Sequence, residues 1–283
     1  MVWSLQQAPN FSDEEFERWN KLLEDRTGIQ LVTHQRGFLQ IQVASRMREL
    51  GVETYGEYFS QLTDGVRGAL EWSILVDRLV VKETSYFRHR DSIEYVRQLL
   101  QQRINNRELK GNFEVWSLGC ATGEEPYSLS MVINDCFELA GLESFYGVTA
   151  TDISQPALQH ARQGIYSARK LESLSLEEKS RYFDLGDSDN FQVKRKLRER
   201  VCFSSGNLLN LTQMPMAAMD VIFCQNVLIY FRRWRRREIL NELVSRLKPG
   251  GVLVIGLGEV VDWDHKLVRR APDDRIQAYV RCQ

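Results

Sequence analysis

Short apolar runs alternate with helical patterns through the second half of the chain. Strands are predicted at 113–118, 146–151, 220–224 and 252–257, and helices at 124–139, 154–163 and 235–247. Strands that alternate with helices of about 10–15 residues indicate βαβ units. Residues 113–283 are therefore predicted to form a doubly wound, Rossmann-like α/β domain around a parallel sheet.

One segment of this domain breaks the alternation. Residues from about 165 to 205 predict a short helix near 176–183 and short β pieces at 191–193 and 200–204. We interpret this segment as a small antiparallel β subdomain inserted into the larger one.

The first 90 residues predict an all-α domain. Ser12 and Glu15 match a capping box, and apolar residues follow at helical spacing. Further helices are predicted at 37–50, 54–62, 69–81 and 92–104. The last of these and the polar stretch after it predict a linker of helix and loop at 91–112. A length of 283 residues fits about two domains at roughly 150 residues each.

Several classes of protein are disfavoured by what the chain lacks. No run approaches the roughly 20 apolar residues of a membrane-spanning helix, and the N-terminus has no secretory pattern. The five cysteines form no CxxC pair, which favours free thiols in the cytoplasm. The four histidines share no ligand spacing, so no metal site is expected.

A glycine turn joins the first predicted strand to its helix. Gly119 and Gly123 let a ligand approach the backbone closely, and the helix then starts with Glu124 and Glu125. Two carboxylates suit a cationic ligand better than a pyrophosphate. The alternative is an ordinary turn whose acidic residues favour the helix dipole.

Two other strand ends carry polar residues. Asp152 follows the second strand, where a carboxylate accepts hydrogen bonds from ribose hydroxyls, although it could instead cap the next helix. Asn226 and Tyr230 follow the strand at 220–224 and can reach into the ligand crevice, or simply accompany apolar packing.

Together these motifs resemble the CheR family, the S-adenosylmethionine-dependent glutamate methyltransferases of bacterial chemoreceptors. The matching stretches are KETSYFR (82–88), WSLGCATGEEPYSLS (116–130), ATDIS (150–154), ARQGIY (161–166), FSSGNLL (203–209), FCQNVLIYF (223–231) and LKPGGVLVIGLGE (247–259). Within the family, the chain is most similar to the branch that serves type IV pilus twitching motility.

The resemblance implies a role for each site residue. The methyl donor would be held by Lys82, Thr84, Arg88, Gly119, Glu124, Asp152, Asn207, Leu208, Asn226 and Val227. Glu124 would hold the methionine end, Asp152 the ribose, and Asn207 with Leu208 the adenine. Arg88 and Tyr230 would be catalytic and face the substrate glutamate, and S-adenosylhomocysteine would be the product.

The expected reaction needs no general base, because a glutamate side chain is already ionised at neutral pH. A carboxylate oxygen attacks the donor methyl group in line, so catalysis depends on placement and exclusion of water. Arg88 can hold the carboxylate bidentately, and Tyr230 can orient it with one hydrogen bond.

Three departures from the family pattern stand out. Lys82 replaces a common asparagine at a position that contacts the methyl donor, so it either points outward or weakens binding. Leu257-Gly258-Glu259 replaces a common H-S-E motif. The loop from Leu185 to Phe191 is shorter than in members that dock on a receptor's C-terminal pentapeptide, which predicts independence from such a tail.

The net charge of −1 is a cancellation. Residues 1–90, 91–164 and 165–283 carry net charges of −2, −5 and +6. The acidic middle segment suits a cationic cofactor, and the basic last segment suits an anionic protein partner. The first basic run is Arg232–Arg237, interrupted by Trp234. The second comprises Lys194, Arg195, Lys196, Arg198 and Arg200. The resemblance also directs Arg46 and Arg48 toward the acidic methylation helices of a receptor.

Two other functions are possible on this sequence. The first is an RNA or DNA methyltransferase, in which the basic runs would contact phosphates. The second is an inactive interaction module. Against the first, the chain lacks an N-P-P-Y amine site and a recognisable RNA-binding module. We expect a monomer that acts on chemoreceptors, without nucleic acid and without insertion into the membrane.

Overall fold

The computed structural model describes residues 10–109, 111–143, 145–214 and 218–282. The chain divides into two compact units. The first runs to Val81 and includes Tyr230–Arg232, and the second comprises Lys82–Ile229 and the chain from Arg233 onward. Among the described residues, no helix has the length and apolar character needed to cross a membrane.

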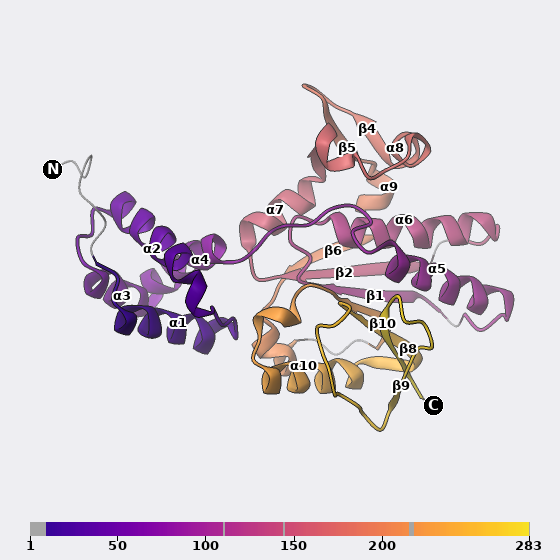
Figure 1. Ribbon diagram of the computed structural model, residues 1–283. Helices are drawn as coiled ribbons and strands as arrows, with labels where there is room; N and C mark the ends of the chain where they lie inside the picture. The colour runs from indigo at the N-terminus through magenta and orange to yellow at the C-terminus, as the bar shows by residue number, and fades with distance from the viewer. Residues whose placement is uncertain (1–9, 110, 144, 215–217, 283) are drawn as a thin grey trace. The chain divides into compact units, whose positions relative to one another are not determined.

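The first unit is all-α, as predicted (Figure 1). Its elements are α1 (Asp13–Thr27), η1 (Thr33–Gln35), α2 (Arg36–Leu50), α3 (Tyr55–Thr63) and α4 (Gly65–Leu79). Ser12 caps α1 by accepting a hydrogen bond from the Glu15 amide, which confirms the predicted capping residue. Trp19 and Tyr58 pack together at the centre of the apolar core.

An ion-pair network ties α2 to α4 on the edge of this core. Arg46 binds Glu71 through two nitrogens, at 2.8 and 2.7 Å, and binds Glu49 through a third at 2.8 Å. Tyr58 donates a hydrogen bond of 2.7 Å to the same Glu71 carboxylate. Arg46 therefore serves its own domain, and of the two arginines directed toward a receptor, only Arg48 is exposed.

The second unit is built on a seven-stranded sheet with the order β6-β2-β1-β7-β8-β10-β9. Its strands are β1 (Phe113–Leu118), β2 (Tyr146–Asp152), β6 (Val201–Ser205), β7 (Met219–Cys224), β8 (Leu247–Ile255), β9 (Val268–Arg270) and β10 (Gln277–Arg281). Five strands are parallel, while β10 runs antiparallel to β8 and β9. The predicted Rossmann-like sheet is confirmed.

Four helices accompany the sheet (Figure 1): α5 (Arg90–Asn105), α6 (Glu124–Leu139), α7 (Gln155–Gln163) and α10 (Arg233–Ser245). Helix α5, which the sequence places in a linker, packs on α6 and buries Ile93, Val96 and Leu100 in the core of this unit.

The inserted segment forms a separate three-stranded antiparallel sheet with the order β3-β5-β4. Its elements are β3 (Ile165–Ser167), η2 (Ala168–Leu171), α8 (Leu176–Tyr182), β4 (Phe183–Leu185), β5 (Asn190–Val193) and α9 (Arg195–Arg198). The predicted antiparallel insertion is confirmed, but residues 201–205 belong to the large sheet, where β6 pairs with β2. A short apolar run does not reveal which sheet it joins.

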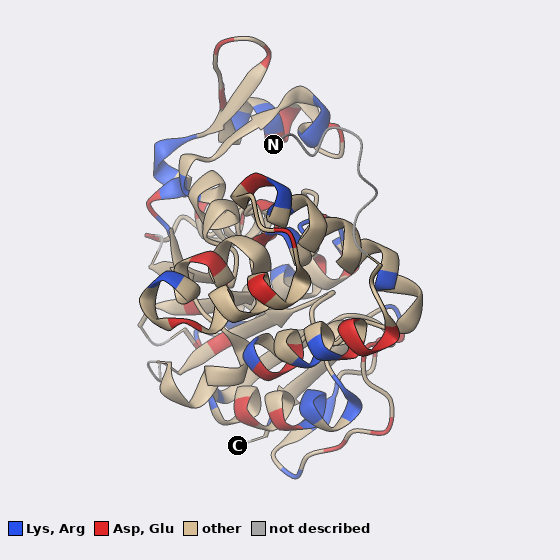
Figure 2. Cartoon of the chain, turned by 90° about the vertical axis from the view of Figure 1, so that its left-hand side faces the viewer, with Lys and Arg blue, Asp and Glu red and all other residues tan. Residues whose placement is uncertain are grey.

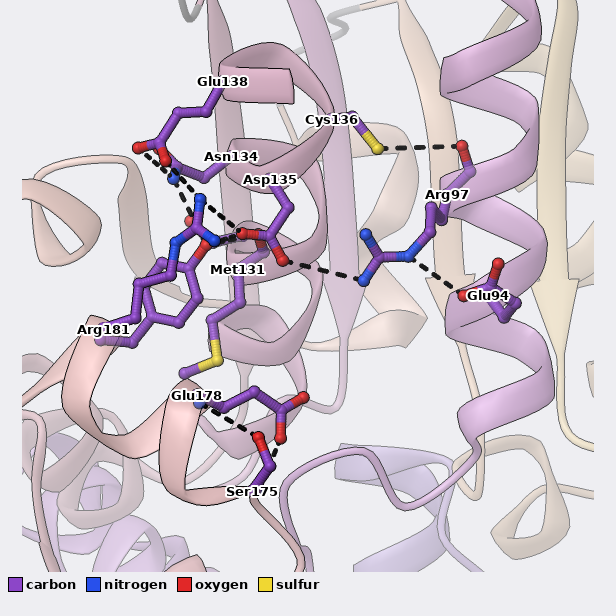
Figure 3. Close-up of polar contacts among 12 residues, drawn as sticks. Glu94, Arg97, Met131, Asn134, Asp135, Cys136, Glu138, Ser175, Glu178 and Arg181 are labelled. Atoms are coloured by element: carbon purple, nitrogen blue, oxygen red, sulfur yellow. Dashed lines mark hydrogen bonds and ion pairs between the residues drawn. The ribbon is translucent and has the colours of Figure 1, made fainter. Parts of the chain in front are cut away.

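Charged side chains fasten the insertion to the outer end of α6 (Figure 3). Arg181 of α8 binds both Asp135 and Glu138, and Arg97 of α5 reaches Asp135 from the other side at 3.8 Å. Hydrogen bonds from Asn134, Arg181 and Lys196 lower the pKa of Glu138 to about 2. Helix α6 is thereby held in place between α5 and α8.

Replacing Arg46 tests the network in the first unit. Arg46→Met should lower the free energy of unfolding by about 1–3 kcal/mol, because the largely buried Glu71 loses its counter-ion. The matched variant Arg48→Met should change it by less than about 0.5 kcal/mol, because Arg48 is exposed. Urea unfolding followed by circular dichroism measures both, and equal losses would contradict this role for Arg46.

Candidate functional site

The predicted site residues follow the carboxyl ends of four neighbouring strands. Strand β1 pairs with β2 on one side and with β7 on the other, so the strand order reverses there. In open α/β sheets, ligands bind at the carboxyl ends of the strands beside such a reversal. Gly119, Asp152, Asn207 and Asn226 lie at or just after the ends of β1, β2, β6 and β7.

The glycine turn after β1 is shaped by close packing. Gly119 has a φ of +69°, and a Cβ atom there would lie 2.3 Å from Cγ2 of Val227. Glycine is therefore required for the turn to approach the loop after β7. The Gly119 amide also donates to the Thr151 carbonyl at 2.8 Å, which joins the turn to the end of β2. The structure thus brings together the predicted residues Gly119 and Val227.

Glu124 opens α6 and is fully buried. Its Oε2 accepts a hydrogen bond of 2.6 Å from Thr122, and its Oε1 lies 2.9 Å from Nζ of Lys170. The sequence pattern did not indicate Lys170, because it lies 46 residues away in the inserted segment and matches no motif. A buried carboxylate at this position suits a cationic group of a ligand.

Asp152 links the ends of β1 and β2. Its Oδ2 accepts from the Ala121 amide and its Oδ1 from the Ser154 amide, both at 2.8 Å. Ser154 caps α7 through the Ala157 amide at 3.1 Å, so Asp152 is free of the capping role. Burial raises the pKa of Asp152, while these amides and the Lys82 ammonium lower it. Whether Lys82 contacts the methyl donor stays a prediction.

The segment after β6 continues from Asp152, because the Gly206 amide donates to the Asp152 carbonyl at 3.0 Å. Asn207 caps η3 (Leu208–Gln213) by accepting from the Leu209 amide at 3.0 Å. Asn207 and Leu208 are both half-buried, and their predicted contact with adenine stays a prediction.

The loop after β7 is held from two sides. Asn226 has a left-handed backbone (φ 60°), and its Oδ1 forms a hydrogen bond of 2.5 Å with Nε2 of His89. Glu259 is buried and accepts from the Gly256 amide at 2.8 Å. Burial raises its pKa, and the amides of Gly256, Ile229 and Val227 lower it. Glu259 thus supports this loop.

The 82–88 segment completes the site in the second unit. The Thr84 carbonyl accepts from Lys170 at 2.9 Å, and the Phe87 amide donates to Ser128 at 3.0 Å. Arg88 is exposed and donates to the Glu83 carbonyl at 2.9 Å. Phe87, like Ala121 and Asn226, has a positive φ, a left-handed backbone that is uncommon for residues other than glycine.

Tyr230 lies in the short helix η4 (Leu228–Tyr230), and with Phe231 and Arg232 it belongs to the first unit. It is half-buried, and its carbonyl accepts from the Gln30 amide at 2.9 Å. Its predicted role opposite Arg88 stays a prediction.

The arginines of the run at 232–237 contact partners within the chain. Arg232 binds Glu24, Arg233 lies 3.1 Å from Asp262, and Arg235 lies 2.8 Å from Glu238. Arg236 and Arg237 donate to backbone carbonyls, each with one bond of 2.8 Å. Figure 2 shows acidic and basic residues together on several helices, and also stretches that are basic only. These arginines therefore have partners within the chain, although the net charge of +6 for residues 165–283 already counts Glu238 and Asp262.

Glu125 is a second acid of the site with an unusual environment. Ser117 donates to its Oε1 at 2.8 Å. Burial raises the pKa of Glu125 to about 8; Ser117 and Arg88 lower it, and Glu259 raises it further. Glu125 thus holds a proton over much of the neutral range. Among the described residues, His, Cys, Asp and Glu form no group of three that could hold a metal ion.

The raised pKa of Glu125 gives a pH-dependent contribution to stability. In the unfolded chain, its proton is lost near the ordinary value of 4.5, but the folded state keeps it to about pH 8. The stabilising contribution is full below pH 4.5 and is lost as the pH rises through about 8. Glu125→Gln should therefore gain stability relative to the unaltered protein as the pH rises.

Urea unfolding of both proteins at pH values on either side of about 8 measures this difference. Glu143→Gln, at an exposed position, serves as the control and should show no such trend. A difference between Glu125→Gln and the unaltered protein that is constant with pH would contradict the assignment.

Comparisons with known proteins agree with this architecture. Residues 82–275 match the SAM-binding domain of CheR methyltransferases, and residues 14–80 match their all-alpha domain. The chain is 34% identical over 251 residues to a chemotaxis protein methyltransferase of Salmonella typhimurium, covering 88% of this chain and 84% of the relative. It is 33% identical over 259 residues to chemotaxis protein methyltransferase 1 of Pseudomonas aeruginosa, covering 89% and 92%.

One similar solved structure is a magnesium protoporphyrin IX methyltransferase from Synechocystis PCC 6803 with bound SAM. It is 16% identical, covers 84% of this chain and 96% of that one, and has a TM-score of 0.38. The two domain matches span nearly all of the described chain. The chain therefore belongs to the CheR methyltransferase family, and its second unit is the S-adenosylmethionine-binding domain of that family.

Proposed function

We propose that this enzyme transfers the methyl group of S-adenosylmethionine to glutamate side chains of a bacterial chemoreceptor in the cytoplasm. The observation that carries the proposal is the pair of acids around the glycine turn, with Glu124 buried at one end and Asp152 hydrogen-bonded to Ala121 at the other. The names of the relatives, which are chemotaxis protein methyltransferases, support the substrate class.

The residues present fit the methyl donor. Glu124 would hold its ammonium, and Asp152, which uses one contact per oxygen for backbone amides, keeps lone pairs for ribose hydroxyls. Asn207 and Leu208 would contact the adenine. Thr84, Gly119, Asn226 and Val227 would line the remainder, with Lys82 beside the ribose end. The bound sulfonium supplies the methyl group and a good leaving group.

The substrate carboxylate is ionised at neutral pH, so the chain has to place it and exclude water. Arg88 is exposed and can bind a carboxylate with two parallel hydrogen bonds. Tyr230 would orient the same group with its hydroxyl. Glu125 holds its own proton up to about pH 8 and is not needed as a base.

Two rival functions have less support. A nucleic-acid methyltransferase needs free cations for phosphates, whereas the arginines at 232–237 bind acids and carbonyls of the chain itself. An inactive module would be favoured by Lys82 if its charge displaced the methyl donor, but both acids that the donor needs, Glu124 and Asp152, are present.

The finer parts of the proposal concern the receptor. The β4–β5 connection is a tight turn closed by the Gly186 amide on the Asn190 carbonyl at 2.8 Å, which supports independence from a C-terminal pentapeptide. The resemblance to the twitching-motility branch supports a receptor of a type IV pilus system. We further propose that the enzyme acts as a monomer.

Methyl transfer to purified receptor cytoplasmic domains tests the function. We expect radiolabelled methyl groups that mild base releases from a pilus-system receptor, to the same extent whether or not its last residues are removed. Label found only on RNA or DNA, or label resistant to base, would contradict the proposal. A strict need for the receptor tail would contradict its independence from the pentapeptide.

Replacing Arg88 tests whether this residue places the substrate rather than binding the methyl donor. Arg88→Ala should lower methyl transfer by about a hundredfold, because a charge-assisted bidentate contact contributes about 1.5–3 kcal/mol to placement of the substrate. Binding of S-adenosylhomocysteine, measured by calorimetry, should change much less. Arg195→Ala, at an exposed surface pair, is the control. Equal losses of transfer and binding would contradict this role.

A further inference from the structure

We propose that Arg246 is a positioning residue for the methyl donor. It holds the segment 206–214, and through it Asn207 and Leu208, in the conformation that recognises adenine. This inference rests on the proposed adenine site. It adds a residue that belongs to none of the sequence stretches matching the family.

Arg246 is a buried charge at the end of α10. Its side chain is 1% exposed, and Glu242 on the preceding turn supplies a carboxylate oxygen 3.1 Å from Nη2 and 3.3 Å from Nε. Burying a charge is costly, and apolar side chains of similar volume often give equal or greater stability. Stability alone therefore does not account for an arginine at this position.

The guanidinium extends from α10 to η3. Nη2 donates to the Leu211 carbonyl, and Nη1 donates to the Met214 carbonyl at 3.4 Å. Both acceptors lie near the end of η3, a short helix whose backbone is irregular at Asn210. Because short helices of this kind have poor internal hydrogen-bond geometry, contacts from outside, such as those of Arg246, help to determine its shape.

The two ends of the segment 206–214 lie against each other. A Cβ atom added to Gly206 would lie 2.5 Å from Cε of Met214, so glycine permits this close approach. The Met214 carbonyl is one of the two acceptors of Arg246. Arg246 thus holds the far end of a closed segment whose near end carries the residues proposed to contact adenine.

Trp116 connects the same arginine to the strands. The guanidinium lies over its ring, with Cζ 5.6 Å from the ring centroid. The indole Nε1 donates to the Thr151 hydroxyl at 2.9 Å, and that hydroxyl lies 3.1 Å from the one of Ser204. Thr151 and Ser204 belong to β2 and β6, and β6 leads into the segment 206–214. Arg246 therefore ties this segment to the sheet beside it.

The arrangement has a consequence for ligand preference. A segment held in one conformation can match the amine and the ring nitrogens of adenine, and it loses less entropy on binding. In a looser segment, the preference for adenine over other purines falls. If Arg246 only stabilised the fold, its loss would lower the amount of folded protein, but each folded molecule would keep the same preference.

Calorimetry with two ligands separates these cases. S-adenosylhomocysteine carries the adenine amine, and S-inosylhomocysteine carries an oxygen in its place. Arg246→Met should weaken binding of S-adenosylhomocysteine about tenfold and lower its preference over S-inosylhomocysteine by about threefold or more. Arg246→Lys, which keeps one charged donor group, should restore part of the preference. If Arg246→Met does not fold, the preference of Arg246→Lys, which should still lie below that of the unaltered protein, tests the same inference.

Arg103→Met is the matched control. Arg103 is also largely buried and binds the Asp220 carboxylate and the Gly250 carbonyl, both at 2.6 Å, with Asp220 near the start of β7. This variant should lower stability and leave the preference unchanged. An unchanged preference in the variants of Arg246 would overturn the inference.

Asn207→Ala distinguishes failure of the inference from failure of the proposed site. It should weaken binding of S-adenosylhomocysteine and lower the preference. If it changes neither affinity, or if the unaltered protein has no preference, the adenine site is misassigned and the inference falls with it. If Asn207→Ala lowers the preference but the variants of Arg246 do not, only the role of Arg246 is overturned.

Discussion

The hydrogen bond from the Ala121 amide to Asp152 is the contact on which the site depends. It joins the turn after β1 to the end of β2, and the Gly206 amide extends the connection to the segment after β6. Three strand ends are therefore fixed by one residue. The strained backbone of the turn, with Ala121 at a φ of 45°, persists because this bond holds it. A ligand that touches all three strand ends meets a surface already in place.

Local patterns predicted the elements well, because they depend on residues near one another in sequence. The capping of α1 by Ser12 and the break at the glycine turn follow from side chains within a few positions. The insertion was also predicted, as an interruption of the alternation, although β5 is the only strand of the small sheet that the predicted β pieces match. Strands β9 and β10 were not predicted, because three and five residues at the end of the chain give little periodicity.

Charged partners could not be predicted in the same way. The sequence shows that Arg46 is basic and lies off an apolar stripe. It does not show that Arg46 binds Glu71, which lies 25 residues later on another helix. The same holds for Lys170 and Glu124, and for the arginines at the start of α10. A charge run reports composition, whereas its function depends on which acids the fold brings near it. The positive total of residues 165–283 is thus weak evidence for an anionic partner.

The small sheet is continuous with η2, and η2 carries the lysine that touches Glu124. Any protein that docks on the small sheet and shifts η2 would change the energy of that contact. If Glu124 holds the methyl donor as proposed, linkage works in both directions, and a bound methyl donor would change the affinity for the docked protein by the same factor. On that proposal, substitutions that adapt the small sheet to a new partner would also change the affinity of the enzyme for its cofactor.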